Sequence, residues 1–382
     1  MNPRSQASYS AAGVDYNQLD EGKRQALTAA LATSELLGAR GGQSIDASRG
    51  EPAFVFEFAD QTLAFVLEGL GTKAIIARQV MDETGVNLFD NVAYDTVAAI
   101  VNDLCCVGAL PLVVNAYFAT GSSDWYEQTD RQAKLIDGWR QACVDAGATW
   151  GGGESPSLPE LVLPGEIELA GSAVGVVPEG RAAILGQDLA PDDEIVFVAS
   201  AGLHANGSSL ARWLVDQKLV SYTTPVPDTG TTFGAALLDR SVMYVDLVKQ
   251  LVEQDRLAIR YLSHITGHGL MKLMRPSRDL TYEIHTLPEV PPVLKFMADL
   301  ADMDDKAAYS TFNMGCGFAV YCGAGDGEAV ADVARELGHR AHVAGVIKEG
   351  PRQVTLLPSE LVPEGVVFGT DAMDLTPRKR AA

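Results

Sequence analysis

The 382-residue sequence is short of positive charge, of cysteine and of long apolar runs. Lysine and arginine together number 29, against 50 aspartate and glutamate residues, so the formal net charge is −21. This balance argues against general binding to nucleic acids or to anionic membranes, because their phosphates attract basic surfaces. An anionic ligand would need local help from glycine turns, helix N-termini, lysine or a metal ion.

Because no apolar run is long enough to span a bilayer, we expect no membrane helix, and residues 1–10 lack the apolar core of a signal peptide. The five cysteines fit no zinc-binding spacing, and the adjacent pair Cys105-Cys106 is a poor candidate for a disulfide. We therefore expect reduced, mostly buried thiols in a cytoplasmic protein. The length allows two or three domains.

The most informative stretch is Leu-Glu-Gly-Leu-Gly-Thr-Lys at residues 67–73, which follows an apolar segment that predicts a strand. Its glycines allow backbone N–H groups to approach a bulky anion. Lys73 offers a point charge for phosphate, and Glu68 is suited to hold a cation that bridges phosphates. The same pattern also fits an ordinary turn after a strand.

Residues 92–107 predict a helix with one apolar side and one polar side. The polar side contains Asp95, Ala99 and Asn102, with Asp103 at its edge. Two acids without lysine or arginine are unusual on a solvated helix face. The alternative is that this side is simply exposed.

The remaining pattern alternates strands and helices. Strands are expected at 53–58, 63–67, 112–118, 167–177, 194–199, 318–322 and 342–347, and helices at 16–37, 73–84, 130–146, 210–217, 270–274 and 328–337. Residues 38–50 predict a mobile loop. The restart of the alternation after a polar turn at 178–180 predicts domains at 1–178 and 179–358, followed by a tail at 359–382.

Small-residue loops at 200–209 and 265–269 each precede a predicted helix, an arrangement that suits phosphate binding. His204 lies in the first loop. It is either a structural histidine bonded to backbone, or an acid, a base or a phosphate contact.

Together these motifs resemble those of the phosphoribosylformylglycinamidine cyclo-ligase family, also called AIR synthetase, from Ser8 to about Leu357. The segments that carry the resemblance are SYSAAGVD (8–15), EGLGTK (68–73), VNDL (101–104), YFATG (117–121), GGE (152–154), GLHANG (202–207), HITG (264–267) and TFNMG (311–315). The sequence departs from the family pattern at Glu68, Asn115, Ser157, Glu168 and His268. Two of these changes keep a carboxylate and two lose one, so ATP binding is expected while the substrate stays open.

The resemblance implies an α/β (α+β) fold of two domains. A mixed N-terminal sheet would pair with that of a second subunit in a homodimer, with the hairpin at 53–67 at the interface. A mixed C-terminal sheet would carry flanking helices.

The resemblance also implies an activity in purine biosynthesis, the cyclisation of formylglycinamidine ribonucleotide to aminoimidazole ribonucleotide with ATP and Mg²⁺. An amide oxygen is phosphorylated, an internal amine attacks that carbon, and phosphate leaves. The open alternatives are another ATP-dependent phosphotransferase of the same superfamily and a non-catalytic nucleotide-binding paralogue.

The implied roles fall into four groups. The catalytic group is His204, Lys73 and Asp103, and the metal ligands are Glu68, Asp95 and Asp103. The ATP-binding group is Gly69, Gly71, Thr72, Lys73, Asn102, Gly153 and Glu154. The substrate-binding group is His204, Asn206, Gly207, Ser208, Thr266, Gly267 and Asn313.

Overall fold

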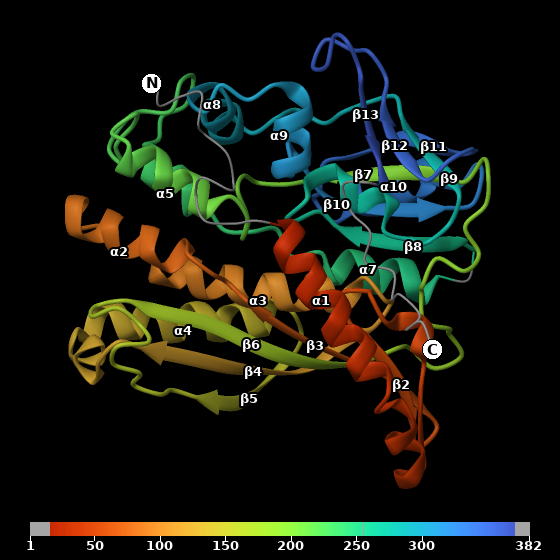
Figure 1. The fold of residues 1–382 in the computed structure, drawn as a ribbon, viewed down its shortest axis with the longest axis horizontal. Helices are drawn as coiled ribbons and strands as arrows, with labels where there is room; N and C mark the ends of the chain where they lie inside the picture. The colour runs from red at the N-terminus through yellow and green to blue at the C-terminus, as the bar shows by residue number, and fades with distance from the viewer. Residues whose placement is uncertain (1–15, 255, 371–382) are drawn as a thin grey trace.

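In the computed structural model, residues 16–254 and 256–370 are described, without the side chains of residues 16–21. The motif at 8–15 and the end of the predicted tail, 371–382, lie outside the described residues. Figure 1 shows two α/β halves that meet along helix α3 (Phe89–Cys105). Each half is built on its own mixed sheet.

Within the described residues, the N-terminal half forms a six-stranded sheet in the order β1-β2-β3-β6-β4-β5. The strands are β1 (Gly42–Ser44), β2 (Phe54–Phe58), β3 (Gln61–Gly69), β4 (Leu110–Thr120), β5 (Thr149–Glu154) and β6 (Ile167–Val176). β4 and β5 are parallel, and the other neighbouring pairs are antiparallel. The other helices of this half are α1 (Tyr16–Leu31), α2 (Lys73–Thr84) and α4 (Thr129–Asp145).

Helices cover one face of this sheet, where α3 packs against β3, β6 and α4. On β3, Ala64 and Val66 are buried towards the helices, whereas Phe65 and Leu67 are 42% and 68% exposed. Since side chains alternate between the two faces of a strand, the second face of the sheet presents apolar residues that no element of this chain covers in the described part.

The C-terminal half forms a seven-stranded sheet, again within the described residues, in the order β13-β12-β9-β11-β7-β10-β8. The strands are β7 (Glu194–Ala199), β8 (Ile259–His264), β9 (Leu280–Ile284), β10 (Cys316–Cys322), β11 (Ala341–Glu349), β12 (Gln353–Leu356) and β13 (Val366–Gly369). The helices are α5 (Ser208–Asp216), α6 (Phe233–Leu237), α7 (Val245–Glu253), α8 (Pro292–Leu300), α9 (Asp305–Thr311) and α10 (Gly327–Glu336). The two mixed sheets confirm the predicted two-domain α/β fold.

Three sequence-based expectations differ from the structure. The helix expected at 16–37 ends at Leu31, where the Thr33 hydroxyl donates to the Ala30 carbonyl and competes with the helical pattern. The loop expected at 38–50 contains β1, which pairs with β2. The tail expected from residue 359 contains β13, which pairs with β12 and buries Phe368, so the C-terminal sheet extends beyond residue 358.

A buried ion pair of the N-terminal half bonds to backbone of the C-terminal half. Lys73, at the start of α2, places its Nζ 2.5 Å from Asp95 Oδ2 on α3, and both side chains are fully buried. The same ammonium donates to the His204 carbonyl at 2.8 Å, and Asp95 Oδ1 accepts from the Ser241 N–H at 2.6 Å. Each charge is therefore paired with its partner and with backbone of the C-terminal half.

Asn102 forms a second such bridge. Its Nδ2 donates to the Val242 carbonyl at 2.9 Å, and its Oδ1 accepts from the Tyr244 N–H at 2.8 Å. The polar side of α3 is thus buried rather than exposed, because it supplies partners to irregular backbone at 241–244 that would otherwise be unpaired. The alternative of a simply exposed face is therefore wrong.

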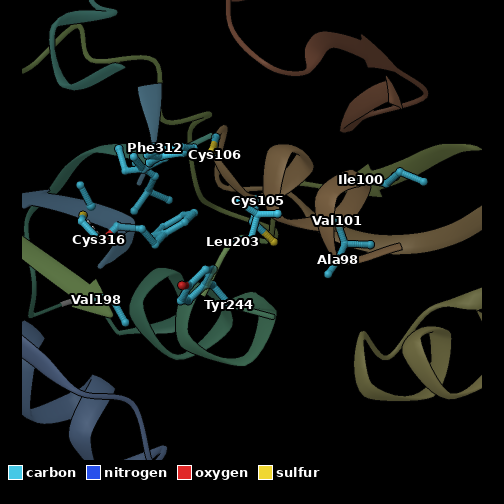
Figure 2. Packing of buried hydrophobic residues seen from close by; sticks show 14 of the residues in the cluster. Ala98, Ile100, Val101, Cys105, Cys106, Val198, Leu203, Tyr244, Phe312 and Cys316 are labelled. Carbon is cyan, nitrogen blue, oxygen red and sulfur yellow. Dashed lines mark hydrogen bonds between the residues drawn. The ribbon is translucent and has the colours of Figure 1, made fainter. Parts of the chain in front are cut away.

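Apolar packing is continuous across the same boundary. Figure 2 shows Cys105 of α3 near Leu203 and Tyr244 of the C-terminal half, all members of one buried cluster. All five cysteines are buried and free, as predicted, and burial raises the pKa of each thiol. Among the described residues, no helix combines the length and apolarity needed to cross a membrane.

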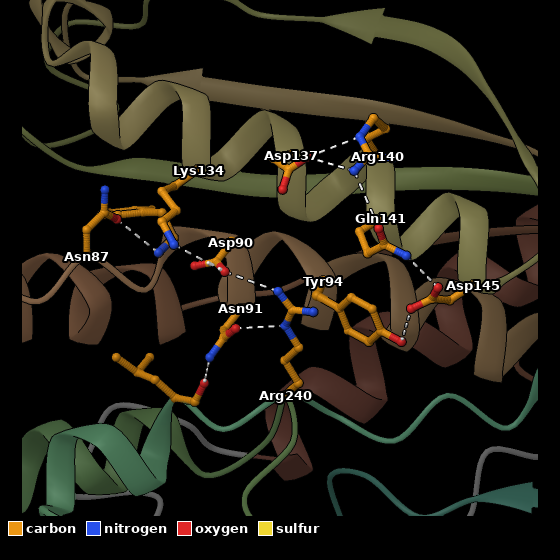
Figure 3. A network of polar contacts seen from close by, with 12 residues as sticks. Asn87, Asp90, Asn91, Tyr94, Lys134, Asp137, Arg140, Gln141, Asp145 and Arg240 are labelled. Carbon is orange, nitrogen blue, oxygen red and sulfur yellow. Dashed lines mark hydrogen bonds and ion pairs between the residues drawn. The ribbon is translucent and has the colours of Figure 1, made fainter.

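At its outer end the boundary is held by exposed polar contacts (Figure 3). Arg240 of the C-terminal half donates to Asn91 and Asp90 on α3 at 2.7 and 3.1 Å. Such partly exposed pairs each contribute only about 0–1 kcal/mol. The buried Lys73–Asp95 pair is therefore the stronger constraint on how the halves meet.

We expect Lys73→Met to destabilise the protein by about 3–5 kcal/mol, because it leaves Asp95 buried without its counter-charge. Urea unfolding without ligand measures this effect. Lys134→Met on the surface of α4 is the control and should change little. The double variant Lys73→Met/Asp95→Leu should recover much of the lost stability. A Lys73→Met variant as stable as the parent would contradict a stabilising role for the Lys73–Asp95 pair.

Candidate functional site

A cavity of about 430 Å³ lies where the two halves meet α1. This volume is typical of small-molecule sites. The N-terminal half contributes Lys23, Arg24, Leu27, Gly50, Glu51, Pro52, Glu68, Gly69, Leu70, Ala99 and Asp103, and the C-terminal half contributes Ala205, Asn206, His264, Thr266, Gly267, His268, Lys272 and Arg275.

Two carboxyl groups face each other at one wall. Asp103 Oδ1 lies 2.6 Å from His264 Nδ1. Burial alone would raise the pKa of Asp103, but His264, Lys272 and Arg275 lower it to about 2. Burial, together with the neighbouring charge of Asp103, raises the pKa of Glu68 to about 7. Near neutral pH the site therefore holds one firmly ionised carboxylate beside one that exchanges its proton.

The opposite charge comes from the turn that follows β8. Lys272 lies in the 3₁₀ segment Gly269–Met274, is 8% exposed, and donates through Nζ to Thr266 Oγ1. Burial and the neighbouring Arg275 lower the pKa of Lys272 to about 8, although Asp103 and Glu68 oppose this shift. Glu51 accepts a 2.6 Å hydrogen bond from the Tyr261 hydroxyl, and burial raises its pKa.

Sequence reasoning placed none of His264, Lys272, Arg275 and Glu51 in the site. His264 belongs to a quoted motif, so the motif itself was a usable signal. Lys272 and Arg275 follow the glycine turn three residues apart, but no ligand pattern prescribes that spacing. Glu51 is far away in sequence and becomes a neighbour only through the fold.

Six predicted residues line the cavity together: Glu68, Gly69, Asp103, Asn206, Thr266 and Gly267. The boundary between the halves instead holds Lys73, Asp95 and Asn102, whose polar atoms contact other protein groups. Asp95 is therefore not available as a metal ligand in this structure, and Lys73 is not the ammonium that lines the cavity.

His204 lies outside the cavity lining. Its backbone is left-handed, with φ of 57°, and its Nε2 lies 3.2 and 3.4 Å from the N–H groups of Ala201 and Val242. Burial lowers the pKa of His204 well below its ordinary value, so the imidazole accepts these contacts in its neutral form. This geometry favours the bracing alternative.

Asn313 is similarly occupied. Its Oδ1 accepts from the Ser200 hydroxyl and the Gly315 N–H, and its Nδ2 donates to the Gly202 carbonyl. The predicted contact with substrate is replaced here by bonds that hold the 200–207 loop. In that loop, Gly207 has φ of 108° and packs against Leu203 and Phe312, where a side chain would not fit.

The glycine turn at 68–73 and the loop at 200–209 meet beside the cavity, which Gly69 and Asn206 line. Thr72 Oγ1 lies 3.2 Å from Ser209 Oγ, next to Ser208 at the N-terminus of α5. Gly71 has φ of 70°, and its N–H bonds the Glu168 side chain, one of the changed acidic positions. The glycine turn therefore sits between the two halves, as a phosphate-binding turn would need.

Gly153 and Glu154 lie on the edge strand β5 and are exposed. The sheet register nevertheless places Gly153 in one row with Ala116, Gly171 and Glu68. Three strand spacings separate the ends of the row, roughly 14 Å. Glu68 follows Ala64 and Val66 on the helix-covered face of the sheet and lines the cavity, whereas Gly153 and Glu154 do not line it.

The donor set suits Mg²⁺ only in part. No group of three His, Cys, Asp or Glu residues suited to a metal occurs in the described part of the chain. Mg²⁺, however, needs only one or two carboxylates when phosphates and water complete its shell. The adjacent Glu68 and Asp103 meet that requirement, and their mutual repulsion would be relieved by a cation.

The fold and the cavity together define a two-domain α/β protein with a charged small-molecule site. Residues 50–177 match the N-terminal domain, and residues 190–357 the C-terminal domain, of the AIR synthase related proteins. The chain belongs to this family, which confirms the resemblance seen in its motifs.

Its curated relatives include phosphoribosylformylglycinamidine cyclo-ligases. That of Alkaliphilus oremlandii is 33% identical over 308 residues, covering 78% of this chain and 85% of the relative. That of Methanothermobacter thermautotrophicus is 30% identical over 350 residues, covering 91% and 96%.

Solved structures share the fold at low identity. The HypE–HypF complex matches with a TM-score of 0.58 and 16% identity, covering 83% of this chain and 92% of the other. HypE in complex with ATP matches with a TM-score of 0.54 and 16% identity, covering 80% and 84%.

The Glu68 carboxyl predicts a pH dependence of stability. Its pKa rises from 4.5 in the unfolded chain to about 7, so its contribution is present below pH 4.5 and is lost as pH rises through 7. Between pH 5 and 8, without metal or nucleotide, the parent should lose on the order of 2 kcal/mol more stability than Glu68→Gln.

Chemical unfolding at each pH in EDTA measures this difference. Glu57→Gln, an exposed site on β2, is the matched control and should keep the parental slope. Because the pKa of Asp103 is about 2, protonation of Asp103 changes the stability only below the range of pH 5 to 8. If the free energy of unfolding changes with pH by the same amount in the parent and in Glu68→Gln, the pKa of Glu68 is not raised by folding.

Proposed function

We propose that this protein catalyses the ATP- and Mg²⁺-dependent cyclisation of formylglycinamidine ribonucleotide to aminoimidazole ribonucleotide. The observation that carries the proposal is the conjunction of cyclo-ligase relatives spanning most of the chain with a cavity that gathers Glu68, Asp103 and the 266–267 turn. The ATP-bound relative of the same fold supports the choice of nucleotide.

Glu68 and Asp103 would hold the Mg²⁺, whose chemistry is to neutralise charge on the transferring phosphoryl group. His264 is the proposed proton acceptor in ring closure, replacing His204. Its Nδ1–H can donate to Asp103, which fixes the ring and leaves Nε2 to accept a proton from the attacking amine. Asn206, Thr266 and Gly267 would position the substrate, so that closure is intramolecular.

The second candidate is phosphorylation of another small molecule by the same site. It is favoured by Asn115 and Ser157, where the family pattern has acids, and by His268, which lines the cavity where that pattern has glycine. The two candidates share the nucleotide chemistry and differ in the acceptor.

We also propose a homodimer formed through the uncovered face of the N-terminal sheet. The hairpin supplies exposed Phe65 and Leu67, and the Phe54 and Phe56 rings stack 5.7 Å apart on the adjacent strand. A partner sheet on this face would bury these rings and would approach Gly153 and Glu154, which supports a nucleotide site shared between subunits.

Purified protein supplied with formylglycinamidine ribonucleotide, ATP and Mg²⁺ should release ADP and phosphate in step with aminoimidazole ribonucleotide. His264→Asn should lower turnover by roughly 10²-fold or more, since Asn cannot accept the proton. His285→Asn, at an exposed position directly after β9, is the matched control. ATP turnover without product, or failure to rescue a purine auxotroph lacking the cyclo-ligase, would favour the second candidate.

The dimer is tested by light scattering over a range of concentrations. The parent should have twice the chain mass, and Leu67→Glu should shift it towards the monomer because a charge would enter the apolar interface. Leu361→Glu, at an exposed leucine outside this sheet, should leave the mass unchanged. A parent that is monomeric at every concentration would exclude the dimer.

A further inference from the structure

The cavity concentrates basic side chains in a chain that is strongly acidic. The net charge is −21, yet Lys23, Arg24, Lys272 and Arg275 all line this one cavity. Lys73, the ammonium of the glycine motif, is absent from that lining because it is paired with Asp95. Lys272 is therefore the buried ammonium of the cavity.

Side chains from the C-terminal sheet region hydrogen-bond the backbone of the turn that carries Lys272. Arg352, directly before β12, donates to the carbonyls of Met274 and Arg275 at 2.8 and 3.0 Å. Tyr321 on β10 donates to the Leu273 carbonyl at 2.8 Å. These bonds fix the backbone that directly follows Lys272, so its ammonium is positioned before any ligand arrives.

The Lys272 ammonium has N–H donors beyond the one that Thr266 accepts. It carries three N–H donors, and its bond to the neutral Thr266 hydroxyl uses one of them. Of the nearby carboxyl groups, Asp103 contacts His264, Glu51 accepts from the Tyr261 hydroxyl, and Glu68 has a raised pKa. Burial and the neighbouring Arg275 work against the charge of Lys272, since two like charges in a poorly solvated site repel.

We propose that Lys272 and Arg275 form a subsite for a phosphate oxyanion, with the Thr266 hydroxyl completing the set of donors. An anion would relieve the repulsion between the two cations and accept the remaining N–H donors. The proposal rests on the phosphoryl-transfer function above and adds to it the residues that bind the phosphate. The phosphate is either the terminal group of ATP or the phosphomonoester of the acceptor.

Calorimetric titration of the full chain with inorganic phosphate, and separately with ATP and Mg²⁺, tests the subsite. Lys272→Met should weaken at least one of these ligands by roughly 10- to 100-fold, the loss expected for a charge-assisted hydrogen bond. Lys272→Arg should keep most of the affinity. Lys295→Met, at an exposed position on α8, is the matched control and should bind as the parent does.

Thermal unfolding distinguishes a role of Lys272 in phosphate binding from a purely structural role. Removing a buried ammonium that repels its neighbour should leave the melting temperature of the unliganded protein unchanged or raised in Lys272→Met. Weakened phosphate binding alone assigns the subsite to the acceptor phosphomonoester, and weakened ATP binding assigns it to the terminal phosphate. Both results support the proposal.

Equal affinities in the parent and Lys272→Met for both ligands would overturn the subsite, as would a parent that binds neither. A fall in melting temperature that Lys272→Arg does not correct, together with lost binding in both variants, would show that Lys272 only braces Thr266. Intact phosphate binding without turnover of formylglycinamidine ribonucleotide would refute the cyclisation and leave the subsite standing.

Discussion

The buried pair of Lys73 and Asp95 is the interaction on which the arrangement of this protein depends. Two charges that are fully removed from water are tolerable only when each has its partner and further hydrogen bonds. Those bonds come from the His204 carbonyl and the Ser241 N–H, both in the other half of the chain. The pair therefore forms properly only when the two sheets are docked, which links the folding of each half to the geometry of the cavity between them.

This constraint separates two kinds of residue within the same motifs. In the glycine stretch, Glu68 and Gly69 line the cavity while Lys73 holds the halves together. On α3, Asp103 lines the cavity while Asn102, its neighbour in sequence, bonds backbone of the other half. On a helix, neighbouring residues lie about 100° apart, so one short motif serves the site with one side and the docking with another.

Much of the fold could be predicted from sequence because local patterns determine it. The bounds of α2 and β7 agree with their apolar periodicity and their glycine neighbours. The short strands β1 and β13 were missed because pairing with a neighbouring strand, rather than their own few residues, makes them strands. In the site, Glu68, Asp103 and Thr266 could be predicted from motifs. Glu51 and Lys272 could not, since only the tertiary fold brings them beside those residues.

His204 shows why motif chemistry alone is a weak guide to roles. A histidine in a small-residue loop next to a helix N-terminus fits both proton transfer and bracing, and the two differ only in what surrounds the ring. Here the ring is buried against two backbone N–H groups, whereas His264 reaches the cavity and contacts an ionised carboxylate. Desolvation keeps the first ring neutral and engaged. The same imidazole chemistry therefore braces a loop at one position and is suited to move a proton at the other, because only the second combines an oriented ring with access to a ligand.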